Sequence, residues 1–352
     1  IKTGTRNESA DLNGISHLTE HMLFKGTTKR GARAVNNFLE RLGGELNAYT
    51  TKEETVIHAT VLKEDISKAV ELLSDLAFHS LYPEKELVKE KDIVLEEISS
   101  YKDTPSEQIF DDFDEFIFKK HPLAMPILGR PKSIKNITSE HIKEYTKRFY
   151  RPSNMCFSIV ADITQSRAES LVDRYFVKNG ADFQSQSDQY DSSIHNESIE
   201  LSSVGEYKRL PKKTHQSHSI VGALAYSMYD KKRLPLALLT NILGGPALNS
   251  KLNHELREKH GLVYTVDASY TPYTDTGLFA IYFGTDRNSV EKSIDIINRE
   301  LTLLKNRPLT DNVLNSYKKQ LLGQLAISSD NAESQCLAMG KSLLFHNRVE
   351  PI

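Results

Sequence analysis

The chain has 352 residues, which is enough for a sizeable buried core and for two domains. Charged residues make up 26% and hydrophobic residues 39%, as in ordinary globular proteins. The formal net charge of −2 gives no electrostatic case for binding nucleic acid or an acidic membrane surface, and no apolar run is long enough to span a bilayer. We therefore predict neither nucleic acid nor a membrane as a partner.

Two further features bear on the compartment. Cys156 and Cys336 lie far apart in apolar segments, which favours buried free thiols over a disulfide. The chain starts without methionine on a segment that reads as the end of a strand, so we expect that residues are missing before it. A signal peptide could precede it, and a cytoplasmic location is our expectation.

The first predicted helix, Leu12 to Phe24, has apolar residues at helical spacing and Asn13 as a plausible N-cap. It contains His-x-x-Glu-His, in which His17 and His21 share one helix face with Glu20 beside them. Two neutral imidazoles suit Zn²⁺, which needs a third protein ligand and an open water position for chemistry. Glu20 could take a proton from that water. The alternative is a chance occurrence of the motif.

The residues around this motif favour the metal site over chance. The stretch from Gly14 to Thr27 closely resembles the zinc-site helix of the pitrilysin, or insulinase, family of zinc peptidases. That family takes its third ligand from a glutamate well beyond the second histidine. At the corresponding distance this chain has Glu97, in the segment Asp-Ile-Val-Leu-Glu-Glu-Ile. The resemblance therefore implies a zinc site of His17, His21 and Glu97. The chain departs from the family at Thr19, where the family usually has a large apolar residue. The resemblance also implies that the chain is truncated at both ends.

The rest of the first half alternates extended and helical patterns. Periodicity and turn residues predict a hairpin and several helices, followed by a buried strand and a last helix. The helices are expected at Ala32 to Leu42, Lys63 to Ser80, Glu84 to Lys102, Ser106 to Lys119, Ser139 to Phe149 and Gln165 to Val177, and the strands at Leu46 to Thr51, Thr55 to Leu62 and Met155 to Ile163.

Three residues of these elements are candidates beside the motif. Glu90 lies seven residues before Glu97, on the same face of the predicted helix. It could orient a metal-binding histidine, or it could be one more solvated glutamate. Asn47 and Ala48 resemble the family's edge strand, whose backbone pairs with an extended substrate. Alternatively, Asn47 only shapes the entry to its strand.

Residues 181–204 are rich in serine, glutamine, aspartate and asparagine, which predicts an interdomain linker. It would separate a zinc-binding domain, residues 1–180, from a second homologous domain, residues 205–352. A long excursion inside one domain is the alternative.

The second half repeats the plan of the first. A strand from His215 to Tyr226 and a helix from Lys232 to Leu243 are followed by a hairpin and a helix from Val290 to Leu304. The hairpin segment from Tyr49 to Ala59 aligns without a gap on Tyr270 to Ala280. We therefore predict an α+β fold of two homologous domains, each a mostly antiparallel or mixed sheet with helices packed on one face.

The second half has no counterpart of the metal motif. Instead, Arg257 and Tyr264 have the separation of an arginine and a tyrosine with which the family contacts bound peptide. By this resemblance, Arg257 would bind substrate carbonyls and Tyr264 would donate to the oxyanion. The alternative is a surface arginine and a half-buried strand tyrosine.

Together these observations predict a zinc endopeptidase or oligopeptidase that cleaves short or unfolded polypeptides bound as an extended strand. It is similar to the short bacterial members related to mitochondrial processing peptidase. Such members commonly pair, so we expect a homodimer or a pair with a paralogous subunit. One rival is an inactive relative that serves as a structural or peptide-binding subunit. The other is a scaffold with an adventitious metal site.

Overall fold

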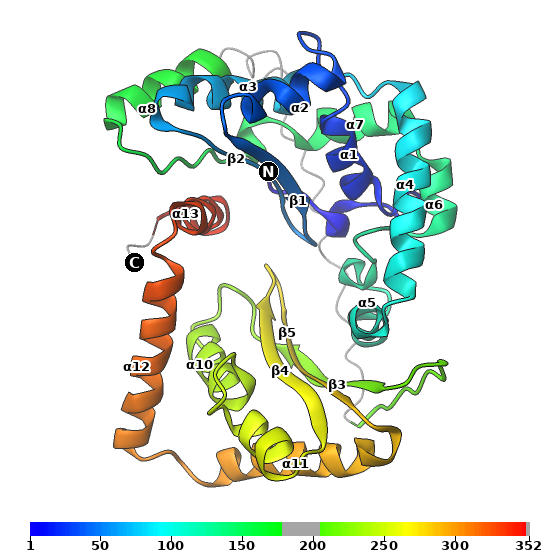
Figure 1. The fold of residues 1–352 in the computed structure, drawn as a ribbon, viewed down its shortest axis with the longest axis vertical. Helices are drawn as coiled ribbons and strands as arrows, with labels where there is room; N and C mark the ends of the chain where they lie inside the picture. The colour runs from blue at the N-terminus through cyan, green and yellow to red at the C-terminus, as the bar shows by residue number, and fades with distance from the viewer. Residues whose placement is uncertain (178–204, 350–352) are drawn as a thin grey trace. The chain divides into compact units, whose positions relative to one another are not determined.

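The computed structural model describes residues 1–177 and 205–349, and these residues pack as two units (Figure 1). The first unit holds residues 1–100, 120–177 and 329–349, and the second holds the remainder of the described residues. The predicted linker, residues 181–204, lies outside the described residues.

Two helices cross the division that was expected near residues 180 and 205. Helix α5 (Pro105–Phe118) packs with the second unit, although the first half of the sequence supplies it. Helix α13 (Ala332–His346) packs with the first unit, although it comes last in the described chain. Each unit is thus completed by a helix from the other half of the sequence.

The first unit has one described sheet, an antiparallel hairpin of β1 (Glu45–Thr50) and β2 (Thr55–Thr60). Apart from α13, its α-helices come from the first half of the chain. They are α1 (Ile15–Leu23), α2 (Ala32–Glu40), α3 (Ile66–His79), α4 (Glu84–Lys102), α6 (Pro131–Asn136), α7 (Ser139–Phe149) and α8 (Gln165–Val172), the last continued by a π-helical turn, Asp173–Val177.

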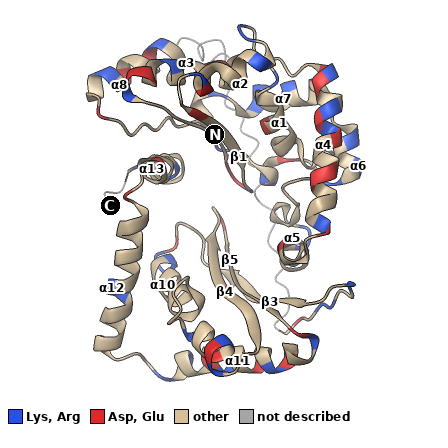
Figure 2. Cartoon of the chain, in the orientation of Figure 1, with Lys and Arg blue, Asp and Glu red and all other residues tan. Residues whose placement is uncertain are grey.

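The core of the first unit has two main apolar clusters. One joins α1, α4 and α7 through buried residues such as Leu18, Val94 and Ile142. The other lies between the hairpin and helices α2 and α3, with Leu39 and Leu72 at its centre. Charged residues recur along α4, as Figure 2 shows, which fits a helix that buries one stripe and exposes the rest.

The second unit is built on a three-stranded antiparallel sheet in the order β3-β5-β4. The strands are β3 (Ser217–Ala225), β4 (Val263–Pro272) and β5 (Gly277–Thr285). In addition to α5, the helices of this unit are α10 (Arg233–Gly244), α11 (Val290–Asn306) and α12 (Asp311–Ser328). A π-helical segment spans Asn253–Lys259. No helix in the described ranges is both long and apolar enough to cross a membrane.

Helices cover both faces of this sheet. Ile281 of β5 is fully buried in a cluster with Ile297 of α11. The next residue, Tyr282, points to the opposite face, where its ring lies 5.3 Å from that of Phe110 on α5. The α+β prediction is confirmed, but helices were expected on one face of each sheet and α5 also covers the second face of this one.

The hairpins of the two units support the predicted repeat. Both have loops of four residues, 51–54 between β1 and β2 and 273–276 between β4 and β5. A short 3-10 turn and a long helix follow each hairpin, α3 in the first unit and α11 in the second.

The strand predicted from Met155 to Ile163 is wrong, because the structure assigns no strand to these described residues. Their neighbour is a helix instead. The Cys156 thiol donates to the carbonyl of Gly340 at 3.0 Å, and the Cys336 thiol donates to the carbonyl of Ser158 at 3.3 Å. Because this segment lies against α13, its backbone has no neighbouring strand to pair with in the described part of the chain, although its apolar residues are partly buried. Both cysteines are free, as predicted, but each is only partly buried.

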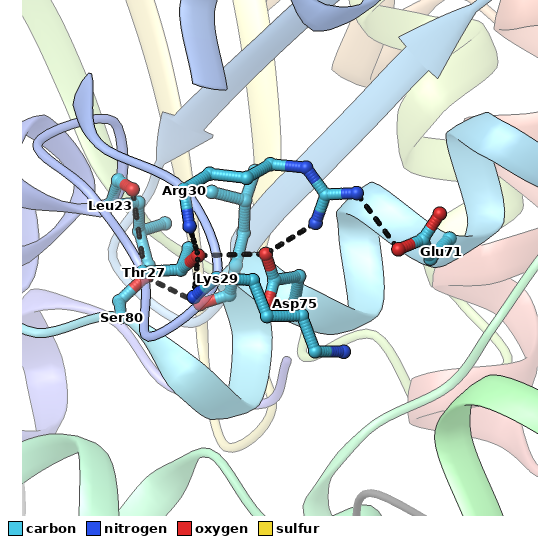
Figure 3. A network of polar contacts seen from close by, with 8 residues as sticks. Leu23, Thr27, Lys29, Arg30, Glu71, Asp75 and Ser80 are labelled. Carbon is cyan, nitrogen blue, oxygen red and sulfur yellow. Dashed lines mark hydrogen bonds and ion pairs between the residues drawn. The ribbon is translucent and has the colours of Figure 1, made fainter. Parts of the chain in front are cut away.

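The loop after α1 is tied to α3 by a buried polar network (Figure 3). The Thr27 hydroxyl donates to Asp75 Oδ2 at 2.7 Å and accepts from the backbone N–H groups of Lys29 and Arg30. Arg30 donates to the same Asp75 oxygen at 2.7 Å and to Glu71 at 2.8 Å. Asp75 is fully buried, so the side chains of Thr27 and Arg30 share a buried acceptor on α3.

We expect Asp75→Ala to lower the free energy of unfolding by about 3 kcal/mol, because it strips the Thr27 hydroxyl and the Arg30 guanidinium of a buried acceptor. Glu71→Ala removes the more exposed partner and should cost about 1 kcal/mol or less. Urea unfolding of the metal-free variants measures both values. Equal losses would show that burial of Asp75 does not set the strength of this network.

Candidate metal centre

The start of α1 is fixed by a buried carboxylate. Glu8 accepts from the backbone N–H groups of Gly14 at 2.7 Å and Ser16 at 2.8 Å, and from the Asn13 side chain at 2.9 Å. Burial raises the pKa of Glu8 to about 7, and the hydrogen bonds from Ser16, Gly14 and Asn13 oppose that rise. The prediction of Asn13 as N-cap is wrong: Gly14 holds that position, and Glu8 supplies the capping oxygens.

Gly14 is required at this helix start for two reasons. Its φ of +97° lies in the left-handed region, and a Cβ atom there would lie 2.5 Å from Cδ1 of Ile134. The helix therefore begins at Ile15, in close contact with its neighbours. From that point α1 buries Leu18 and Met22 completely. The motif histidines lie on the less buried side.

The histidines of α1 and Glu97 of α4 converge. Glu97 Oε2 lies 3.9 Å from Nε2 of His17 and 3.6 Å from Nε2 of His21, and one potential ligand atom of each residue lies within 4.8 Å of the others. A tetrahedral zinc ion with bonds of about 2 Å would separate its ligand atoms by about 3.3 Å. The arrangement thus fits a three-ligand zinc site after small side-chain movements. No other such group of His, Cys, Asp or Glu occurs in the described part of the chain.

Electrostatics favour the neutral ligand form of His17. Burial, and to a smaller extent the neighbouring His21, lowers the pKa of His17 to about 3. An uncharged imidazole can offer its nitrogen lone pair to a cation. The donor set of two imidazoles and one carboxylate matches the ligand types that zinc takes in catalytic sites.

Glu20 lies on the same side of α1 and is oriented by the hairpin. Thr50, the last residue of β1, donates its hydroxyl hydrogen to Glu20 Oε2 at 2.6 Å. Burial raises the pKa of Glu20, and this hydrogen bond partly offsets the rise. Thr50 gives the carboxylate a fixed direction. Nothing in its residue type or spacing identified this role from the sequence.

Glu90 of α4 contacts His21, one of the two motif histidines, and Lys25. Its Oε2 lies 3.1 Å from Nδ1 of His21, and its Oε1 lies 2.7 Å from the ammonium of Lys25. Of the two alternatives for Glu90, its burial and its contact with His21 favour the orienting role over a solvated glutamate. Lys25 was not a candidate from the sequence, although it lies within the stretch that resembles the family.

Asn47 and Ala48 lie in β1, paired with His58 and Ile57 of β2. In the described residues this sheet has two strands, so β1 pairs on one side only. The Asn47 side chain accepts from the N–H of Ala48 at 3.0 Å, which also agrees with a local shaping role.

Arg257 and Tyr264 belong to the second unit, whereas the candidate ligands His17, His21 and Glu97 belong to the first. Arg257 lies in the π-helical segment, half exposed, with Nε 3.9 Å from a carboxylate oxygen of Glu258. Tyr264, on β4, is exposed and donates its hydroxyl hydrogen to Asp286 at 3.2 Å. Asp286 raises the pKa of Tyr264, so the phenol remains a donor near neutral pH. Both side chains are accessible to a ligand.

The low pKa of His17 predicts how the stability of the metal-free protein depends on pH. Unfolded histidine takes up a proton below about pH 6.5, whereas folded His17 stays neutral until pH approaches 3. The contribution of neutral His17 to the free energy of unfolding is therefore fully present above pH 6.5 and is lost as pH falls. The loss should amount to about 2 kcal/mol between pH 7 and pH 5.

His17→Gln removes the titrating group, so its unfolding free energy should fall less than that of the wild type over the same range. Urea unfolding at pH 7, 6 and 5 gives the difference. Parallel pH profiles for the two proteins would contradict the assigned cause.

Comparison with known protein families places this site in a wider group. Residues 1–131 match the family model described as insulinase (peptidase family M16), and residues 136–321 match the peptidase M16 inactive domain. The histidine motif and Glu97 lie in the first match, and Arg257 and Tyr264 lie in the second.

Curated relatives agree with the family models. An uncharacterized zinc protease, YmxG, of Bacillus subtilis is 33% identical over 98% of this chain and 81% of its own length. A probable mitochondrial-processing peptidase subunit beta of Arabidopsis thaliana is 27% identical over all of this chain and 66% of its own length.

Solved structures show the same fold. A crystal structure of a protease from Helicobacter pylori has a TM-score of 0.84 at 22% identity and covers 98% of this chain and 83% of its own. The peptidase M16 inactive domain from Pseudomonas fluorescens has a TM-score of 0.77 at 21% identity, over 98% and 81% of the two chains.

The resemblance inferred from the sequence is confirmed, and zinc is the cofactor that the names of the relatives support. The chain belongs to the insulinase, or pitrilysin, family of zinc peptidases, family M16.

Proposed function

We propose that this protein is a zinc-dependent endopeptidase or oligopeptidase that hydrolyses peptide bonds in short or unfolded polypeptides. One observation carries the proposal: His17, His21 and Glu97 converge from two helices, and Glu20 lies on the same side of α1. Three ligands with an adjacent carboxylate are what a hydrolytic zinc site needs.

His17, His21 and Glu97 would hold the metal. When bound, zinc would polarise the scissile carbonyl and lower the pKa of a water molecule to about 7. The contribution of this chain is to keep two imidazoles and a carboxylate close together before the metal arrives.

Glu20 is the general base of the proposed reaction. Its carboxylate takes a proton from the attacking water and passes it to the leaving amine, so the proton is neither gained nor lost overall. The Thr50 hydroxyl holds one oxygen of Glu20 at 2.6 Å, which leaves the other oxygen to accept the proton. Burial raises the pKa of Glu20 and strengthens it as a base near neutral pH.

The substrate would bind as an added strand along β1, at Asn47 and Ala48. A strand with backbone N–H and C=O groups available on one side is a template for an extended peptide. Only short or unfolded chains can present such a segment, which excludes tightly folded proteins as good substrates. Comparing the cleavage of one protein in its folded and denatured forms tests this selectivity, which equal rates would contradict.

Arg257 and Tyr264 would complete the site from the second unit. Arg257 has five N–H donors for substrate carbonyls, and Tyr264 can donate to the oxygen that becomes negative in the transition state. Their exposure, at 49% of the Arg257 side chain and 55% of Tyr264, supports a role in contacting a ligand.

Assembly and location complete the proposal. We infer a homodimer or a pair with a paralogous subunit, since a relative is named as subunit beta of a processing peptidase. A cytoplasmic location in a bacterium is the accompanying expectation. Light scattering on the purified chain, alone and with a candidate paralogue, tests the assembly, and a monomer under both conditions would contradict it.

An inactive, peptide-binding subunit is the alternative. The match to an inactive domain covers residues 136–321, which include neither the three metal ligands nor Glu20. All four of these residues are present in the chain. Digestion of an unstructured peptide with and without a chelator separates the two functions, because an inactive subunit would cleave in neither condition.

Glu20→Gln should retain zinc and lower the turnover of an unstructured peptide by about a hundredfold or more, because the amide cannot accept the proton. Glu96→Gln is the matched control, since Glu96 is an exposed glutamate next to Glu97 and has no assigned role. Peptide cleavage and zinc content are measured on both variants. Full activity of Glu20→Gln with bound zinc would remove Glu20 as the base.

Tyr264→Phe should lower kcat by about a hundredfold and change KM little, because it removes a hydrogen bond made in the transition state. Tyr207→Phe, at another exposed tyrosine of the second unit, should behave as the wild type. Steady-state kinetics on one unstructured peptide give both constants. If Tyr264→Phe and Arg257→Ala both leave kcat/KM unchanged, the second unit takes no part in catalysis.

A further inference from the structure

Lys25 connects the end of the histidine helix to the glutamate helix. Its ammonium lies 2.7 Å from Glu90 Oε1, and the side chains of Lys25 and Glu90 are 24% and 5% exposed. The other oxygen of Glu90, Oε2, lies 3.1 Å from Nδ1 of His21. The two oxygens of one buried carboxylate thus have different partners, a lysine and a metal-ligand histidine.

We propose that Lys25 is a positioning residue for zinc binding, which acts by holding the Glu90 carboxylate in the orientation that directs His21 toward the metal. The inference rests on the proposed zinc site of His17, His21 and Glu97. It adds a residue that is neither a proposed metal ligand nor the proposed base.

The first step of the argument concerns the His21 ring. An ionised carboxylate can only accept hydrogen bonds, so Nδ1 of His21 must donate to Glu90. In a neutral ring, a proton on Nδ1 leaves the lone pair on Nε2. This Nε2 lies 3.6 Å from Glu97 Oε2, so the free lone pair is on the side of the third ligand. A fixed Glu90 therefore selects both the tautomer and the direction of His21.

The second step concerns what fixes Glu90. A carboxylate with a single partner can rotate about its last side-chain bond. The contact of Lys25 with the other oxygen restrains that rotation. Because Glu90 is nearly buried, little water is available to replace the lysine.

The third step concerns what fixes Lys25. Its backbone N–H donates to the carbonyl of Met22 at 3.2 Å, so the residue continues directly from the end of α1. Thr27, close behind it, is bound to the buried Asp75 in the network of Figure 3. The ion pair of Lys25 with Glu90 consequently joins α1 to α4, the two helices that carry the ligands.

The sign of the effect separates this role from simple electrostatics. A lysine close to the site repels a divalent cation, so removal of its charge alone should tighten zinc binding. A positioning role predicts the opposite, because His21 is less well oriented without Lys25. Second-layer partners of metal ligands typically contribute 10- to 100-fold in metal affinity.

The test is a set of zinc dissociation constants, measured by competition with a chromophoric chelator at fixed pH. Lys25→Met should raise the dissociation constant about tenfold, and Lys25→Arg, which keeps a cationic donor, should restore most of the loss. Lys29→Met, at an exposed lysine of the same loop, is the matched control and should bind as the wild type. In a Glu90→Gln background, Lys25→Met should have little further effect, because Lys25 acts through Glu90.

Unchanged or tighter zinc binding by Lys25→Met would overturn the inference, as would an undiminished effect in the Glu90→Gln background. If Lys25→Met does not fold, as judged by thermal unfolding of the metal-free protein, Lys25→Gln answers the same question with a polar side chain. Failure of the underlying zinc site gives a different result: the wild type and His21→Gln would then bind zinc equally weakly.

Discussion

The packing of α1 on α4 is the constraint on which the proposed metal centre depends. Two histidines come from α1 and the third potential ligand, Glu97, comes from α4, so the distance between the helices sets the distance between the ligands. Buried residues such as Leu18 and Val94 supply the apolar contact, and the pair of Lys25 with Glu90 adds a polar one. A close-packed core of this kind would keep the proposed ligands together before any cation binds.

Helix α1 also buries polar groups that have no hydrogen-bond partner among the residues that the structure describes, which is unfavourable for stability. Nδ1 of His17 and the hydroxyl of Thr19 are buried without a hydrogen-bond partner in the described residues, and both belong to α1. Unpaired groups of this kind each cost about 1–3 kcal/mol. At His17 the cost accompanies the proposed role as a metal ligand, because burial keeps the imidazole neutral. The Thr19 hydroxyl has no comparable role, at a position where the family usually has a large apolar residue.

Local patterns predicted the helices and hairpins well, because spacing and turn residues are properties of a short stretch. The motif also predicted which side chains of α1 would meet, since residues four apart share a face. Contacts between distant segments could not be predicted in this way. The capping of α1 by Glu8, the bond of Thr50 to Glu20 and the exchange of α5 and α13 between the units all depend on tertiary packing. The strand expected at Met155 failed for the same reason, because its neighbour is a helix.

The zinc content of the purified protein tests the account most directly. After dialysis against metal-free buffer, the wild type should retain about one zinc ion per chain, as expected for a three-ligand catalytic site. Glu97→Gln should retain much less, and Glu96→Gln, which changes the exposed neighbouring glutamate, should match the wild type. Equal zinc content in the wild type and Glu97→Gln would show that α4 does not supply the third ligand and would contradict the account.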